Sequence, residues 1–218
     1  HPLTQSQLPG DRVVLLHHFD SCDETFYHTL PYLKVWWQRY RDLGLLLVGI
    51  HSSRYADCST TENIQYGLHR LGIDWPVYND AQRQLLQPWA GRHTLRQWLV
   101  DPTGPTVFDH YGDGAYQKLE ELMGISLQKL RPGVTLPTAA TRQRPEDHPN
   151  VVVYPATAKM QFGHAWDAAP RIPITLQRDE ERPYHYRFAS ISPDRFYISG
   201  RWIWGADALI YQGNHHHP

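Results

Sequence analysis

The chain has 218 residues, of which 41% are hydrophobic and 20% are charged, and its formal net charge is −1. These values are ordinary for a soluble globular protein, and a nearly neutral chain offers no basic surface, so we expect no nucleic-acid partner. No run approaches the ~20 apolar residues of a membrane-spanning helix, so we expect no transmembrane segment. Two cysteines fit neither a disulfide-dense scaffold nor a zinc module.

The stretch from Val13 to Ile50 predicts a βαβ unit, because an apolar run at each end is typical of a buried parallel strand. Ser21, followed three residues later by Glu24, has the pattern of a capping box, so we expect the intervening helix to begin near Cys22. In such a unit the chemistry lies in the turn after the first strand, where strand ends meet a helix N-terminus. The apolar stripe of this helix comprises Phe26, Leu30, Leu33 and Trp37.

The segment that follows predicts further helices and strands of an α/β domain. Thr60 or Thr61 is a suitable cap for the first of these helices. Turn residues over 101–105 predict a hairpin. The expected elements are a helix over 62–71, a short strand or extended segment over 73–78, a short helix over 80–90, hairpin strands over 96–100 and 106–111, and a helix over 115–130 with or without a break at Gly124.

The composition changes near residue 131, where four prolines fall within residues 131–150 and few residues are apolar, so we expect a linker there. Beyond it, alternating apolar and polar residues predict strands rather than helices. The expected organisation is a first domain over 12–130, a linker over 131–150, and a small all-β appendage over 151–213. Its strands are expected over 151–154, 172–176, 184–191, 196–204 and 208–212.

A collinear set of motifs over residues 12–125 resembles the thioredoxin-like domain of exported TlpA/DipZ-type thiol-disulfide proteins. The resemblance implies an α/β thioredoxin-like fold, with a central mixed sheet flanked by helices, and an exported or periplasmic setting. In the tail, Ser199 to Trp202 resembles the carbohydrate-binding-module-like segment that follows this domain in DipZ-type proteins. The motifs of the first domain include LPYL at 30–33, VGIH at 48–51, WPV at 75–77, LVDP at 99–102 and HYGDGAY at 110–116.

The resemblance does not extend to the active-site residues of that family, which this sequence lacks. A dithiol oxidoreductase of this type has a thiolate at a helix N-terminus, a second thiol three residues later and a cis-proline facing them. When this sequence is aligned with the family pattern without gaps, anchored at Leu30-Pro31, the two cysteine positions fall on Asp23 and Phe26. The cis-proline position falls on Leu95, which Thr94 precedes.

Shifting the turn by one residue brings Cys22 to the first cysteine position, but Thr25 then occupies the second. Either register lacks a CxxC motif, so a dithiol cycle cannot run within this turn. Three states of Cys22 stay open: a reactive single thiol, an inert free thiol, and a disulfide with Cys58. The resemblance implies that both cysteines follow neighbouring parallel strands. Such a disulfide would close a loop of about 36 residues and stabilise the fold by ~3–4 kcal/mol.

Other candidate sites are weaker. His17 and His18 are adjacent on a predicted strand, so their side chains face opposite sides and cannot share a metal ion. We therefore predict no metal site, and no cofactor. Trp202 and Trp204 lie two residues apart and share one strand face, where they form either an aromatic surface for a carbohydrate ligand or a buried contact with the first domain or a partner.

These observations favour a redox-degenerate thioredoxin-like protein that acts as a non-catalytic binding or accessory subunit of a larger exported or membrane-associated complex, with a protein partner. One alternative is an enzyme, a monothiol oxidoreductase or a peroxide-reactive protein that uses Cys22. Another is a carbohydrate-binding protein that uses Trp202 and Trp204. The former active-site surface is expected to comprise Cys22, Asp23, Thr25, Phe26, Thr94 and Leu95.

Overall fold

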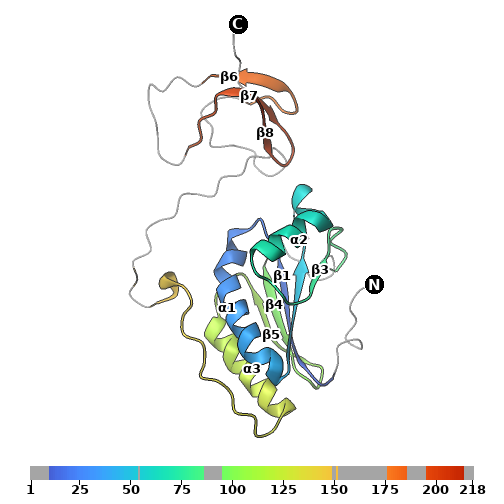
Figure 1. Cartoon of the computed structure of the whole chain (residues 1–218), viewed down its shortest axis with the longest axis vertical. Coiled ribbons are helices and arrows are strands. Elements are labelled where there is room, and N and C mark those ends of the chain that lie inside the picture. Colours follow the sequence, from blue (N-terminus) through green and yellow to red (C-terminus); the bar gives the residue numbers. More distant parts are fainter. Residues whose placement is uncertain are drawn as a thin grey trace. The chain divides into compact units, whose positions relative to one another are not determined.

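The computed structural model describes residues 10–53, 55–85, 95–148, 151, 176–185 and 195–213. The chain divides into two compact units, His1–Val151 and Val152–Pro218. The first contains a five-stranded mixed sheet with helices, and the second contains a three-stranded antiparallel sheet (Figure 1). The predicted fold class, a thioredoxin-like α/β domain with a small all-β appendage, is confirmed. Within the described residues, no helix is both long enough and apolar enough to cross a bilayer.

The sheet of the first unit has the strand order β3-β2-β1-β4-β5. Strands β1, β2 and β3 are parallel, whereas β4 pairs antiparallel with β1 and with β5. The strands are β1 (Val13–Phe19), β2 (Leu45–His51), β3 (Val77–Asn79), β4 (Arg96–Val100) and β5 (Thr106–Tyr111). The helices are α1 (Glu24–Tyr40), α2 (Thr61–Arg70) and α3 (Tyr116–Leu130), with 3-10 turns η2 (Arg41–Leu43), η3 (Asp57–Ser59) and η4 (Pro145–Asp147).

Helix α1 begins at Glu24, two residues after the start that the capping-box pattern predicted. Asp23 is its N-cap, and the Asp23 carboxylate accepts hydrogen bonds from the Thr25 backbone N–H at 3.0 Å and the Thr25 hydroxyl at 2.8 Å. Ser21 does not cap the helix, because its hydroxyl lies 2.9 Å from Nε2 of His51 on β2. The start predicted near Cys22 was therefore wrong, since a side chain 30 residues away engages the expected cap.

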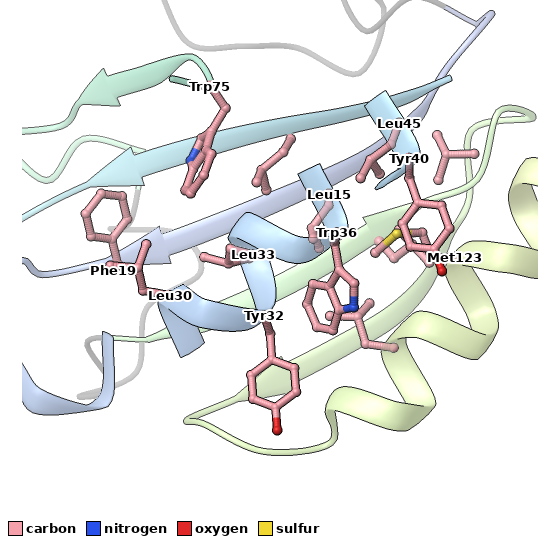
Figure 2. Close-up of a cluster of buried hydrophobic side chains, with 14 of the residues drawn as sticks. Leu15, Phe19, Leu30, Tyr32, Leu33, Trp36, Tyr40, Leu45, Trp75 and Met123 are labelled. Carbon is pink, nitrogen blue, oxygen red and sulfur yellow. The ribbon is translucent and has the colours of Figure 1, made fainter. Parts of the chain in front are cut away.

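One face of the sheet packs against α1 and α3 and forms the hydrophobic core (Figures 1 and 2). Trp36, not the predicted Trp37, is the fully buried tryptophan of α1, because the inward face continues from Leu33 to Trp36 and Tyr40, at spacings of three and four. Trp37 is half-buried at the edge of this face. Figure 2 shows Leu15, Phe19, Leu30, Leu33, Trp36, Tyr40, Leu45 and Met123 converging on this core.

Most of the remaining predicted elements of the first unit are present, but the helix expected over 80–90 is not formed in its described part. Residues 80–85 form turns, because the Asp80 carboxylate accepts the backbone N–H groups of Gln84 at 2.8 Å and Leu85 at 3.1 Å. Residues 86–90 lie outside the described residues. Helix α2 has the expected cap, Thr60, and α3 continues without a break through Gly124.

Residues 131–148, which were expected to form a linker, pack along the first unit. We call this segment the strap. The Tyr32 hydroxyl of α1 donates to the Asp147 carboxylate at 2.6 Å and accepts the Gln143 backbone N–H at 3.0 Å. The buried Glu120 of α3 accepts the Ala140 backbone N–H at 2.9 Å. The strap is therefore held by side chains of two helices that also contribute to the core.

Replacing Tyr32 with phenylalanine is expected to loosen the strap. Burial and the bond to Asp147 raise the pKa of Tyr32 to about 12, so its hydroxyl stays a donor at neutral pH. Losing it leaves Gln143 without this acceptor and costs about 1–2 kcal/mol. Limited proteolysis should cleave the strap faster in Tyr32→Phe than in Tyr27→Phe, whose hydroxyl bonds to the Ser21 carbonyl outside the strap. Equal cleavage rates would show that the hydroxyl does not hold the strap.

The second unit contains strands β6 (Glu181–Tyr184), β7 (Gly200–Trp204) and β8 (Leu209–Gly213). Strand β7 lies between the other two and pairs antiparallel with both. The strand predicted over 196–204 is therefore shorter than expected, and the strand predicted over 208–212 is present. The other predicted strands, including those over 151–154 and 172–176, fall largely outside the described residues. The small core of this sheet consists of Leu176, Tyr184, Ile198 and Trp204.

Candidate functional site

The candidate site is formed by two loops that leave neighbouring parallel strands at the same end of the sheet. One loop follows β1 and contains Cys22, and the other follows β2 and contains Cys58. The register pairs Phe19 with His51, so both strands end side by side. The two cysteines form a disulfide with a Cα–Cα separation of 7.1 Å, which is one of the three states that the sequence left open. Because the chain has only two cysteines, neither is a free thiol in this structure.

The loop that carries Cys22 is fixed by side-chain hydrogen bonds as well as by the disulfide. The Cys22 backbone N–H donates to the carboxylate of Asp20 at 2.9 Å, and Asp20 is fully buried. The Tyr27 hydroxyl donates to the Ser21 carbonyl at 2.9 Å. Cys22 itself is exposed, whereas Cys58 is half-buried in η3. The exposed side of the disulfide is thus its Cys22 side.

The predicted former active-site surface needs correction, because three of its residues are buried. Asp23 is 4% exposed and its carboxylate caps α1. Phe26 is 0% exposed and stacks on Phe19 with ring centroids 4.4 Å apart, so it is part of the core. Leu95 is 2% exposed and belongs to the same core. Thr94 lies outside the described residues, which leaves Cys22 and the half-buried Thr25 as the residues of this set that reach solvent.

A serine and a histidine form a pair in this loop that the sequence pattern did not single out. Nε2 of the buried His51 lies 2.9 Å from the Ser21 hydroxyl oxygen and accepts the Ser21 backbone N–H at 3.3 Å. Nε2 is therefore unprotonated, and burial lowers the pKa of His51, which keeps the ring neutral. One feature of the sequence could have indicated this pair: Ser21 follows the first predicted strand and His51 ends the second, and these two strands are neighbours. The pair anchors the Cys22 loop to β2.

His17 and His18 lie on opposite faces of β1, as predicted from strand alternation. His17 faces α1, with its ring 6.1 Å from that of Phe26, and His18 pairs in register with Arg96. Burial lowers the pKa of His17 to about 3 and that of His18 to about 4, so both are neutral at pH 7. In the part of the chain that the structure describes, no group of three or more His, Cys, Asp or Glu side chains is arranged to hold a metal ion.

The predicted aromatic surface of the second unit is also corrected. Trp204 is 6% exposed and packs in the small core of its own unit, so it cannot present its ring to a ligand. Trp202 packs against the same core, and its Nε1 donates to the Ser199 carbonyl at 3.0 Å. The ring of Trp202 lies 4.9 Å from that of Tyr211, which is 47% exposed. The two tryptophans therefore do not form an exposed pair.

A cleft of about 890 Å³ lies in the first unit between the start of α3 and the strap. Two polar groups that line it, Tyr32 and Asp147, are already bonded to each other, and the Asp147 carboxylate also accepts from Arg144 at 2.9 Å. These bonds hold the strap in place. We therefore assign the candidate site to the disulfide-linked loops and not to this cleft.

Comparison with known proteins supports the fold and extends the similarity into the second unit. No protein-family model matches the chain. The chain is 26% identical over 219 residues to the protein DipZ of Mycobacterium tuberculosis, a match that covers 97% of this chain and 29% of DipZ. It is 30% identical over 118 residues to the human NHL repeat-containing protein 2, and this match covers 54% of this chain and 16% of that protein. The chain thus spans less than a third of these curated relatives.

Solved structures show the same fold for the first unit. A thioredoxin-like protein in its oxidized form superposes with a TM-score of 0.52 at 20% identity, covering 59% of this chain and 86% of that one. A thioredoxin-like superfamily protein gives 0.50 at 19% identity, covering 63% and 90% of the two chains. With this strand order and these structural neighbours, the first unit has a thioredoxin-like fold, it is similar to part of DipZ, and its sequence contains no CxxC motif.

Proposed function

We propose that this chain is a redox-degenerate thioredoxin-like protein that works by binding, as a non-catalytic accessory subunit of a larger exported or membrane-associated complex. One observation carries this proposal: the two positions aligned with the catalytic cysteines hold a helix cap and a core residue. Asp23 binds the first turn of α1, and Phe26 is fully buried. The CxxC form of the dithiol cycle needs a thiol at each of these two positions, one helical turn apart, and neither side chain supplies one.

The proposed setting is extracytoplasmic. Disulfides persist in oxidising compartments and are rare in the cytosol, and the Cys22–Cys58 bond fits such a compartment. The similarity to DipZ, of which this chain matches 29%, supports a domain that works together with other protein segments. The partner is expected to be a protein, and its contact region is expected around the exposed Cys22 loop.

A monothiol oxidoreductase or peroxide-reactive enzyme is the second candidate, and the exposure of Cys22 favours it. This enzyme requires Cys22 as a thiolate, because the thiolate is the nucleophile in exchange and in peroxide reduction. The disulfide with Cys58 would have to be reduced before each such reaction. Carbohydrate binding through Trp202 and Trp204 loses its basis with the burial of Trp204.

An insulin-reduction assay with dithiothreitol separates the two functions. The full chain is expected to leave the rate at that of dithiothreitol alone, because the turn that holds Cys22 lacks the second thiol of a CxxC motif, and the other thiol, Cys58, is half-buried on a different loop. The Cys22→Ser/Cys58→Ser double variant is the matched control and should give the same rate. Acceleration by the wild-type chain that is lost in Cys22→Ser would overturn the non-catalytic proposal in favour of the enzyme.

A further inference from the structure

We infer that the Cys22–Cys58 disulfide is a covalent capture site for a partner that carries a free cysteine thiol, with Cys22 as the sulfur that is attacked and Cys58 as the one that leaves. The inference rests on the proposed function, because it names the chemistry by which the same site holds a partner. It differs from a CxxC mechanism in that its two sulfurs come from different loops, 36 residues apart in sequence.

Access selects Cys22 as the attacked sulfur. In thiol–disulfide exchange, the sulfur that an incoming thiolate can reach receives the new bond. Cys22 is exposed in the turn that precedes α1, whereas Cys58 is half-buried in η3. A thiolate carried on another protein is bulkier than a small thiol, so this difference in exposure favours Cys22 still more strongly.

Both loops keep their own hydrogen bonds when the disulfide opens, so exchange does not require unfolding. On the Cys22 side, Ser21 is held by the hydroxyl of Tyr27 and by His51. On the Cys58 side, the Ser59 hydroxyl donates to the Tyr55 carbonyl at 3.0 Å, and the Asn79 amide donates to the Ser59 carbonyl at 3.0 Å. The disulfide therefore joins two loops that are already anchored to the sheet.

The step balances without an added oxidant. The partner thiolate attacks Sγ of Cys22, a new disulfide forms between the partner and Cys22, and the bond to Cys58 breaks. The electron pair of that bond leaves on Sγ of Cys58, which takes a proton from water. Return attack by Cys58 on Cys22 releases the partner. Because Phe26, one turn along α1, has no thiol, this return attack by Cys58 is the route by which the chain itself reverses the adduct.

The experiment exposes the native full chain to two thiols in separate arms, glutathione and a peptide with a single cysteine. After an acid quench, free thiols are blocked with N-ethylmaleimide, and the products are read by intact mass and peptide mapping. We expect one adduct per chain, on Cys22, with Cys58 alkylated. An adduct on Cys58, or no adduct until denaturant is added, would overturn the inference. An adduct with glutathione but not with the peptide would show that the site reacts with small thiols and does not capture a protein cysteine.

Single-cysteine variants give an independent check. Cys58→Ser leaves Cys22 as a thiol, which should form a mixed disulfide with oxidised glutathione under native conditions. The matched Cys22→Ser variant should show loss of that adduct, because Cys58 is less accessible. Far-UV circular dichroism confirms that both variants are folded. A partner that binds the Cys22→Ser/Cys58→Ser double variant as tightly as the wild type would leave the proposed function intact and refute covalent capture.

Discussion

Lowering the pH from 7 to 5 is expected to reduce the free energy of unfolding by about 4 kcal/mol through His17 and His18. Their pKa values in the folded protein are lowered to about 3 and about 4 by burial, against 6.5 for the ordinary side chain. Below pH 6.5 the unfolded chain binds a proton at each histidine, but the folded chain does not. Unfolding then takes up protons, so stability is present above pH 6.5 and is lost as the pH falls toward 4.

The structural cause is the burial of both rings, which have no hydrogen-bond partner among the described residues. His17 and His18 are 0% and 1% exposed, and none of their four ring nitrogens has a partner in the described structure. The neighbour of His17 on β4 is Gln97, whose amide is also buried and has no hydrogen-bond partner within the described part of the chain. Among the residues that the structure describes, no acid raises the pKa of either ring, so the cost of protonating it in the core is not offset.

Urea unfolding at a series of pH values, followed by hydrogen exchange of β1 amides, measures this dependence for the first unit alone. His17→Phe should remove about half of the loss, because one titrating group then remains of the two counted. Its phenyl ring would lie between Phe19 and Phe26, which the imidazole already contacts. The control is His28→Gln, since His28 is 41% exposed and pairs with Asp113. If the free energy of unfolding fell as much between pH 7 and pH 5 in His17→Phe as in the wild type, His17 would not be a source of the pH dependence.

Local patterns predicted most strands and helices of the first unit because apolar runs and their periodicity are local properties of the sequence. The apolar runs at 13–16 and 45–50 became β1 and β2, and the turn at 101–105 joins β4 and β5 as expected. The prediction failed where a long-range contact decides the outcome. Ser21 is a good cap by residue type, but His51 engages it, and Asp23 caps α1 in its place.

The strap and the second unit show the same limit in different chemistry. The composition of residues 131–148 is that of a linker, yet a single hydroxyl on Tyr32 bonds to both Asp147 and Gln143. Sequence composition cannot show which distant side chain supplies such a bond. Likewise, the spacing of Trp202 and Trp204 correctly places both on one side of β7, but it does not say whether solvent or the unit's own core lies on that side.

Replacing both cysteines with serine is expected to lower the free energy of unfolding by about 3–4 kcal/mol while leaving the native loops in place. The disulfide closes a loop of 36 residues, and removing it increases the conformational entropy of the unfolded chain. The folded loops retain the bonds of Ser21 to His51 and of Asn79 to Ser59, so the native state loses little.

Urea unfolding of the oxidised protein, the reduced protein and the Cys22→Ser/Cys58→Ser variant at pH 7 tests this expectation. The last two should agree, because both lack only the cross-link. A matched Ser21→Ala variant removes the hydroxyl next to His51 but keeps the disulfide, and should cost about 1 kcal/mol. If the reduced protein were as stable as the oxidised one, the bond would add nothing to stability. If the reduced protein lost amide protection only in the two loops, relative to the oxidised protein, the cross-link and not the loops' own hydrogen bonds would position Cys22.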